Sequence, residues 1–187
     1  MDNKLNLSEY YEEYRQNIRP EWLDGQLDIL KRKILDTKAT GGKLVFAGNG
    51  ASAAIASHVA LDFTKQAGMR SVTFHDPGVI TAFVNDFGGD FWLSKACDMY
   101  VDPDDLAIFI SVSGESPNVV NAANELAKRG IETISFTGKA EDNSLGQASV
   151  MNFWVDSRAY NIVECIHMIW ITTVIDMIIG KSEYSVS

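Results

Sequence analysis

Two loops of small polar residues carry the residue types that bind phosphate. The first, Gly48-Asn49-Gly50, follows the apolar run 44–47 and precedes Ser52 and an alanine-rich segment. This order predicts a strand, a glycine turn and a helix N-terminus, with Ser52 as the N-cap residue. Free backbone N–H groups and the helix dipole both favour an anion at such a turn. The first loop therefore predicts a phosphate site.

The second loop holds three serine hydroxyls directly after another predicted strand. Ser111, Ser113 and Ser116 follow the wholly apolar run 106–110, and Pro117 suits the first position of a helix. Serine at a strand end is also ordinary turn chemistry. The carboxyl ends of parallel strands share one edge of a sheet, however, so both loops can converge on one ligand. That convergence favours a phosphate site over a turn alone.

Four titratable side chains could supply acid–base chemistry. His58 and Asp62 are four residues apart after the first loop, and Glu164 and His167 are three apart in a late apolar segment. On helices, each pair shares one face. Such pairs can transfer protons or bind a divalent metal such as zinc. We expect His58, Asp62 and Glu164 as the zinc ligands. Two buried, hydrogen-bonded pairs are an equally open interpretation.

The first loop also fits the fingerprint of a dinucleotide site. Gly48 and Gly50 have the required spacing to Ala53, and Asp76 follows the second predicted strand, where a ribose-binding acid could lie. A dinucleotide site does not explain the serines of the second loop. We therefore expect no nucleotide cofactor.

Composition and charge exclude several classes of protein. The chain has 187 residues and a net charge of −9, which argues against a nucleic-acid partner, because such a partner needs a basic face. The apolar run 162–179 is interrupted by polar residues, so we expect no membrane partner. Two cysteines and an N-terminus without an apolar signal region predict a cytoplasmic protein.

Alternating strands and helices predict an α/β fold. We expect a three-layer α/β/α sandwich around a parallel sheet, within a single domain. The predicted parts are an N-terminal helical extension (1–40), an α/β core (41–180) and a tail (181–187). Predicted strands cover 44–47, 71–74, 106–110, 131–136 and 150–155, and 85–90 is expected to be a loop. The N-terminal helices could pack on their own domain or on another subunit.

Three motifs resemble the SIS (sugar isomerase) domain, and more closely the phosphoheptose isomerases, which act on sedoheptulose 7-phosphate. They are Gly48-Asn49-Gly50-Ala51-Ser52, Asn85-Asp86-Phe87-Gly88 and the serine-rich stretch 111–118. The resemblance runs from Lys43 to Gly180. It implies a five-stranded parallel sheet in flavodoxin-like order, a homotetramer or dimer with sites between subunits, and aldose–ketose isomerisation of a phosphorylated sugar.

The resemblance also implies roles for individual residues. Those expected to bind the phosphate are Ser52, Ser111, Ser113 and Ser116. Asn49 and Asp86 are expected to meet the sugar chain. Asp62 is the expected base, and the expected acids or metal ligands are His58, Glu164 and His167.

Several positions depart from the family pattern. Asp62 replaces a glutamate, Glu164 replaces a glutamine, and Glu115 adds a negative charge to the phosphate loop. Thr172 stands where the family has its second, catalytic histidine, and threonine is a poor proton carrier. These changes keep a second hypothesis open, in which the chain is a catalytically silent sugar-phosphate sensor or an assembly protein of the kind that binds the bacterial replication initiator.

Overall fold

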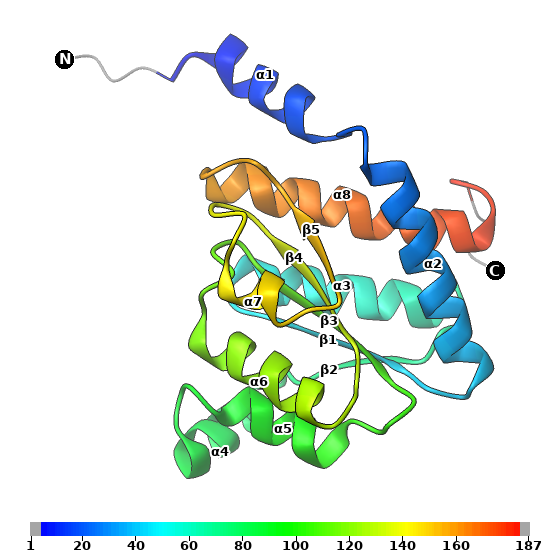
Figure 1. Ribbon diagram of the computed structural model, residues 1–187, viewed down its shortest axis with the longest axis vertical. Coiled ribbons are helices and arrows are strands. Elements are labelled where there is room, and N and C mark those ends of the chain that lie inside the picture. The colour runs from blue at the N-terminus through cyan, green and yellow to red at the C-terminus, as the bar shows by residue number, and fades with distance from the viewer. Residues whose placement is uncertain (1–4, 184–187) are drawn as a thin grey trace.

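Five parallel strands in the order β2-β1-β3-β4-β5 form the central sheet of the computed structural model, which describes residues 5–183 (Figure 1). The strands are β1 (Leu44–Gly48), β2 (Ser71–Thr73), β3 (Leu106–Ser111), β4 (Thr133–Thr137) and β5 (Met151–Trp154). This is the predicted flavodoxin-like order, so the predicted fold class is confirmed. The strand order reverses between β1 and β3, which is where ligands bind in sheets of this kind.

Helices cover both faces of the sheet, as a parallel sheet requires. They are α1 (Leu7–Asn17), α2 (Leu23–Ala39), α3 (Ala51–Lys65), α4 (Pro77–Phe87), α5 (Trp92–Tyr100), α6 (Pro117–Lys128), α7 (Ser144–Gln147) and α8 (Tyr160–Ile179). One core cluster joins the sheet to α2, α3 and α8. A second cluster joins the opposite face to α5, α6 and α7. Every residue of β1, β3 and β4 is buried, because each strand is covered from both sides.

The register of β1 and β3 brings the two predicted phosphate loops together. Gly48, the last residue of β1, pairs with Ile110 of β3. The chain therefore leaves adjacent strands at the same level of the sheet, and 49–52 starts beside 111–116.

The two N-terminal helices pack differently. Helix α2 buries Leu23 and Ile34 in the core, so it belongs to its own domain. Helix α1 projects from the body of the molecule and buries none of its residues, and it leaves Leu7 and Tyr11 largely exposed (Figure 1). The predicted tail, 181–187, lies partly outside the described residues.

Helix α8 is long and apolar enough to cross a membrane by length and composition alone. Eight of its residues are buried in the core of this structure, among them Trp170 and Val174. A core helix of a globular domain shows the same composition, and the packing of α8 against α2 and α3 accounts for it.

Two local predictions need correction. Gly50, with φ 56°, occupies the N-cap position of α3, so Ser52 is already inside the helix. The predicted loop at 85–90 begins only at Gly88, because α4 has no breaking residue before that glycine. Asp86 therefore lies in the last turn of α4.

Candidate functional site

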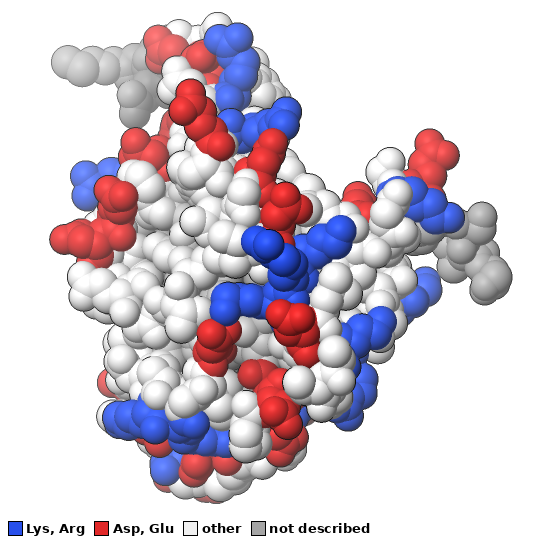
Figure 2. All heavy atoms as spheres, turned by 45° about the vertical axis from the view of Figure 1, so that its right-hand side comes forward, with Lys and Arg blue, Asp and Glu red and all other residues white. Residues whose placement is uncertain are grey.

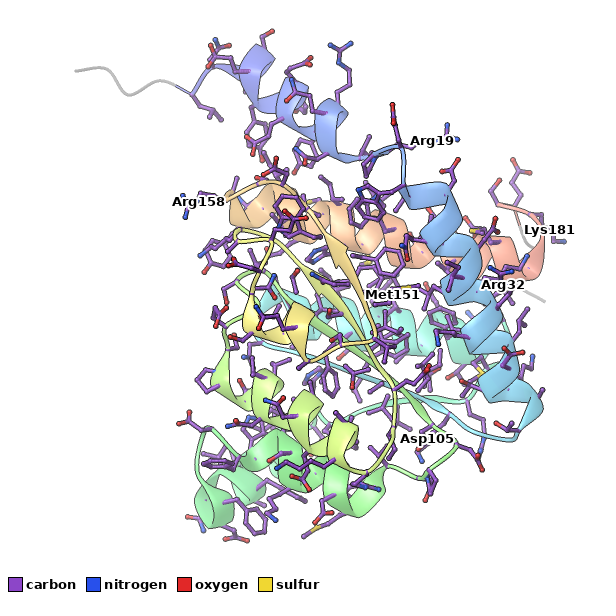
Figure 3. The ribbon with its side chains drawn as sticks, viewed as in Figure 1. Arg19, Arg32, Asp105, Met151, Arg158 and Lys181 are labelled. Atoms are coloured by element: carbon purple, nitrogen blue, oxygen red, sulfur yellow. The ribbon has the colours of Figure 1, made fainter. Side chains whose placement is uncertain are left out.

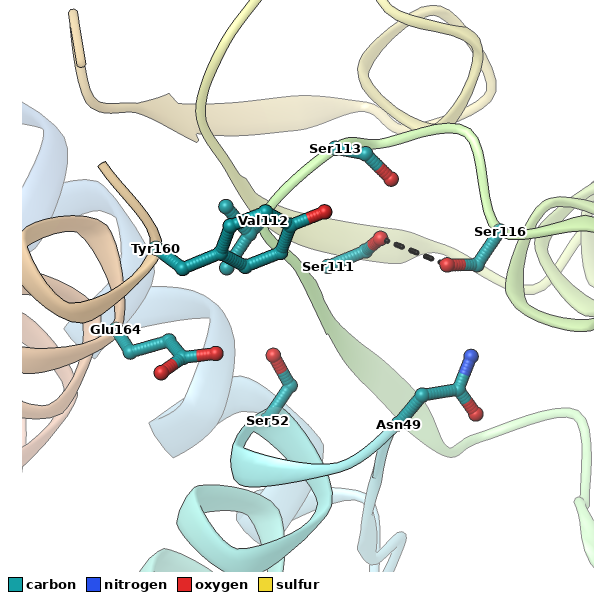
Figure 4. A pocket seen from close by; sticks show the side chains of 8 residues that line it. All are labelled: Asn49, Ser52, Ser111, Val112, Ser113, Ser116, Tyr160 and Glu164. Carbon is teal, nitrogen blue, oxygen red and sulfur yellow. Dashed lines mark hydrogen bonds between the residues drawn. The ribbon is translucent and has the colours of Figure 1, made fainter. Parts of the chain in front are cut away.

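A cavity of about 100 Å³ lies between the ends of β1 and β3 and the start of α8 (Figure 4). Its lining residues are Asn49, Ser52, Ser111, Val112, Ser113, Ser116, Tyr160 and Glu164. The structure thus brings together all the residues expected to bind substrate except Asp86. It also places Glu164 among them.

Asp86 is the expected sugar-binding residue that does not line the cavity. It is exposed in the last turn of α4, and its Oδ1 accepts a hydrogen bond of 2.9 Å from Asn85. In a single chain, this carboxylate faces its own helix end and solvent.

The serine loop is shaped by hydrogen bonds within itself. The hydroxyls of Ser111 and Ser116 are 3.4 Å apart, and the Gly114 N–H donates to the Ser111 carbonyl at 3.1 Å. Ser116 is the N-cap residue of α6, directly before Pro117, but its hydroxyl makes no cap bond to the helix backbone. That hydroxyl is turned toward the cavity, where the N-terminus of α6 also points (Figure 4).

Asn143 holds the serine loop from behind. Its Nδ2 donates to Thr137 Oγ1 at 3.0 Å and to the Ala140 carbonyl at 2.7 Å, while its Oδ1 accepts from the Gly146 N–H. Gly114 passes so close that a Cβ at this position would overlap the Asn143 side chain, and its φ of +66° also favours glycine. The loop is therefore packed against a fixed side chain.

The first loop is held by two side-chain contacts. The amides of Asn49 and Asn118 exchange two hydrogen bonds, of 2.9 and 3.0 Å. The Gly48 N–H donates to His75 Nε2 at 3.4 Å, and His75 Nδ1 lies 3.3 Å from Ser57 Oγ. Burial lowers the pKa of His75, which keeps the neutral ring able to accept that bond. The role of His75 could not be predicted from the sequence, because the hydrogen-bond partner of a histidine in a turn depends on the fold.

Glu115 points away from the cavity. Its carboxylate accepts bonds from the Ser144 N–H at 2.8 Å and from Ser144 Oγ at 2.6 Å, and these bonds lower its pKa. The negative charge that Glu115 adds to the loop sequence is thus directed at α7 rather than at the anion site.

Glu164 is the one charged side chain among the lining residues of the cavity. Partial burial raises the pKa of its carboxyl group. A carboxyl group that a bound ligand can reach can act as a general acid or base, and a raised pKa favours that use.

His167 lies in the core rather than in the site, which corrects the expectation of a catalytic or metal-binding role. Its ring is fully buried, and its Nε2–H donates to the Thr137 carbonyl at 3.0 Å. Burial lowers the pKa of His167 to about 4, so the ring is neutral near pH 7. The buried alternative is correct for this histidine, although its partner is a backbone carbonyl and not Glu164.

The His58–Asp62 pair forms on α3 but does not line the cavity of its own chain. His58 Nε2 is 3.1 Å from Asp62 Oδ2, with the histidine side chain 52% exposed and the aspartate side chain 18% exposed. The buried-pair interpretation therefore does not apply here. Thr172 is also engaged elsewhere, because its hydroxyl donates to the Met168 carbonyl of its own helix at 2.8 Å.

The expected zinc ligands do not meet within one chain. Across residues 5–183, no three His, Cys, Asp or Glu side chains come close enough together to hold a metal ion. His58 and Asp62 are paired on α3, while Glu164 faces the cavity from α8. The donor set of a single chain does not fit zinc, and no step of the reaction is derived from it.

Asp76 does not act as the ribose-binding acid of a dinucleotide site in this structure. Its Oδ1 caps α4 by accepting from the Gly78 and Val79 N–H groups at 2.8 and 3.3 Å. A helix cap explains why an aspartate follows the second strand in the sequence.

On the surface, basic and acidic side chains are interspersed over the face that Figure 2 shows.

Comparison with known proteins identifies relatives over most of the chain. The family model of the SIS domain matches residues 9–138. A phosphoheptose isomerase of Nitratidesulfovibrio vulgaris is 32% identical over 160 residues, which are 81% of this chain and 76% of that protein. A probable phosphoheptose isomerase of Thermoplasma acidophilum is 32% identical over 93% of this chain and 96% of its own length.

The fold has solved counterparts as well. The structure of phosphoheptose isomerase GmhA from Neisseria gonorrhoeae superposes with a TM-score of 0.82 at 24% identity. The match covers 93% of this chain and 96% of that one.

Proposed function

The chain belongs to the SIS domain family, as an isomerase of a phosphorylated sugar related to the phosphoheptose isomerases, and we propose that sedoheptulose 7-phosphate is its substrate. The observation that carries this proposal is the cavity at the switch point of the sheet. It combines four serine hydroxyls, which suit a phosphate, with a carboxyl group of raised pKa on Glu164.

The phosphate binds against the serine loop. Ser111, Ser113 and Ser116 present hydroxyl groups, and the N-termini of α3 and α6 both end at the cavity. Hydroxyl and amide donors around a phosphate oxygen are strong partners because the acceptor is charged. Ser52 closes the site from the first turn of α3.

Glu164 serves the chemistry at the other end of the cavity. Aldose–ketose isomerisation moves a proton between two adjacent carbons through an enediol, while a hydroxyl proton passes between the two oxygens. We propose that Glu164 carries the proton between the oxygens. A carboxyl group of raised pKa suits this role because it can donate to one oxygen and accept from the other.

A second group must remove the carbon-bound proton, and we propose Asp62 for it, with His58 holding its carboxylate. Since this pair does not line the cavity of its own chain, a second copy must supply it. Leu61, beside Asp62 on α3, is 60% exposed, and Ile169 of α8 and Tyr11 of α1 are exposed as well. These exposed apolar side chains are available to a surface that another subunit covers, and we propose a homotetramer or dimer.

Turnover is tested with sedoheptulose 7-phosphate and NMR detection of the aldose product. We expect product with the wild-type protein and its loss in Glu164→Gln. Glu125→Gln, at a half-buried acid on α6, removes the same charge away from the cavity and is expected to retain turnover. A wild-type protein that gives no product from this sugar would contradict the proposed substrate.

A mixing experiment tests the shared site. Asp62→Asn and Glu164→Gln are each expected to be inactive alone. When both variants are co-expressed, some sites contain an intact residue of each kind only if the two come from different chains. We therefore expect activity to return in the mixed oligomer. No recovery, in mixed oligomers verified by mass spectrometry, would contradict a site built from two subunits.

Zinc and cellular location are separate proposals. We propose the cytoplasm as the location, in keeping with a metabolic enzyme of phosphorylated sugars. We propose that His58 and Asp62 bind zinc only together with donors from a second chain, and metal analysis of the purified protein tests this. Active protein without zinc would remove zinc from the proposal.

A non-catalytic role has one specific observation in its favour. The hydroxyl of Thr172, which by the resemblance stands where the family has its catalytic histidine, is bonded to its own helix. A protein that gains thermal stability with sedoheptulose 7-phosphate but gives no product from any sugar phosphate tested would favour this second candidate.

A further inference from the structure

The cavity lacks a positive charge among its own lining residues. They supply hydroxyl groups, a side-chain amide and one acid, Glu164, but no lysine or arginine. A sugar phosphate brings up to two negative charges to this place. Neutral hydrogen-bond donors can bind a phosphate, but a nearby carboxylate such as that of Glu164 repels the phosphate charge.

Lys139 is bonded to a residue of the cavity lining. Its Nζ donates to Tyr160 Oη at 2.9 Å and lies 4.2 Å from the centre of the tyrosine ring. Tyr160 is the first residue of α8, and its hydroxyl lies on the side of Ser111 and Ser113 (Figure 4). The ammonium group is therefore held against a residue that lines the cavity together with the serine hydroxyls.

The backbone places Lys139 there by two hydrogen bonds. The N–H of Gly138 donates to the carbonyl of Val112, which lines the cavity, at 3.0 Å. The N–H of Lys139 donates to the Ser157 carbonyl at 2.9 Å. This segment thus runs between the serine loop and the start of α8.

Lys139 is also the one described non-glycine residue with a positive φ, of 58°. This conformation is unfavourable for a lysine, and the bonds on either side of it maintain it. Arg158, the neighbouring cation at the start of α8, points away from the molecule (Figure 3).

We propose that Lys139 is a phosphate-binding residue that supplies the positive charge missing from the serine cavity, with Tyr160 positioning its ammonium group. The inference rests on the proposed function, because it assumes that a phosphorylated ligand occupies this cavity. The lysine is half-buried and its chain is long, so a phosphate on the serine hydroxyls can take over the hydrogen bond now made to Tyr160.

The test compares ligand affinity in wild-type and variant proteins by calorimetric titration. The probes are inorganic phosphate, sedoheptulose 7-phosphate and unphosphorylated sedoheptulose. Lys139→Met keeps the length of the chain and removes the charge, and we expect it to weaken both phosphate-containing probes about tenfold. Lys139→Arg is expected to restore most of that affinity, and Tyr160→Phe to weaken it about threefold.

The matched control is Lys128→Met, which removes one positive charge on α6, where Lys128 forms an ion pair with Glu125. We expect this variant to bind phosphate as the wild-type protein does. The loss in Lys139→Met should shrink as salt is raised, because screening weakens a charge interaction more than a neutral hydrogen bond.

The outcomes separate this inference from the proposed function. Wild-type protein that binds phosphate, with Lys139→Met binding it equally tightly, would overturn the role of Lys139 alone. Equal weakening by Lys128→Met would overturn it too, because only the net charge would then matter. Wild-type protein that binds neither phosphate nor sugar phosphate would overturn the proposed function and this inference with it.

Discussion

Glu164 and His167 lie less than one turn apart on α8, yet they meet opposite environments. Glu164 faces the cavity, where partial burial raises its pKa while solvent and ligand can still reach it. His167 is enclosed by the core and bonded to a backbone carbonyl, and its pKa falls to about 4.

The difference shows that residue type alone does not decide chemistry. A histidine has the better intrinsic pKa for proton transfer at pH 7, but here it is neutral and unreachable. A carboxyl group has a less suitable intrinsic pKa, but partial burial in the cavity raises the pKa of Glu164. We therefore expect changes at Glu164 to affect turnover, and changes at His167 to affect stability.

The largest expected effect is on turnover in Glu164→Gln. Loss of a proton-transfer group lowers kcat by about 100- to 10,000-fold, while the melting temperature should stay within a few degrees of wild type. Turnover is measured by NMR, and stability by thermal unfolding. Full activity in this variant would show that the cavity carboxyl group does not take part in the reaction.

The second effect concerns the stability of the protein in acid. His167 stays neutral in the folded state down to about pH 4, whereas in the unfolded chain it takes up a proton below about pH 6.5. Its stabilising effect is thus present above pH 6.5 and is lost as the pH falls toward 4, by up to about 1.4 kcal/mol per pH unit.

Urea unfolding at pH 7, 6 and 5 measures this slope. His167→Leu fills a similar volume without a titrating group, so we expect a shallower dependence of stability on pH and unchanged turnover at pH 7. A variant with the wild-type slope would assign the acid sensitivity to other groups, and a large loss of turnover would return His167 to the catalytic machinery.

A smaller effect is expected on the phosphate side of the cavity. Ser116→Ala removes one hydroxyl from the serine loop and should weaken the binding of inorganic phosphate about tenfold. Ser94→Ala, which removes a hydroxyl bonded to the carbonyl of Phe91 at the start of α5, is the control and should leave binding unchanged. Equal affinities in both variants would remove Ser116 from the phosphate site.

The smallest effect is expected at Thr172. Because its hydroxyl already donates to carbonyls of its own helix, Thr172→Val should change turnover by less than about twofold. A loss of a hundredfold or more would mean that this threonine has taken over the role of the family's histidine. Thr172 would then act in the reaction together with Glu164.

Local patterns were sufficient for most of the fold. Apolar strands bounded by turn residues predict all five strands and their parallel arrangement, and Gly48–Gly50 and Ser111–Ser116 locate the cavity. The predicted ends of helices were less accurate where more than one residue could begin or end the helix. Gly50 takes the cap position predicted for Ser52, and α4 continues to Phe87, into the stretch predicted as a loop.

The environment of each titratable group could not be read from the chain. Glu164 and His167 have similar apolar neighbours in the sequence, and only the direction of the helix face separates cavity from core. The contact between Lys139 and Tyr160 could not be predicted, because it joins the loop after β4 to the first residue of α8, 21 residues further along the chain. The sequence Gly138-Lys139 does not by itself indicate a binding role for the lysine, because that role depends on the contact with Tyr160 in the fold.

The packing of Gly114 against Asn143 has a consequence for the kinetics of binding. The serine loop is already in one conformation before a ligand arrives, since Asn143 is itself held by Thr137 and Ala140. Little conformational entropy is then lost when phosphate binds. Association should follow a single second-order phase, whose rate rises linearly with ligand concentration instead of levelling off at the rate of a loop rearrangement.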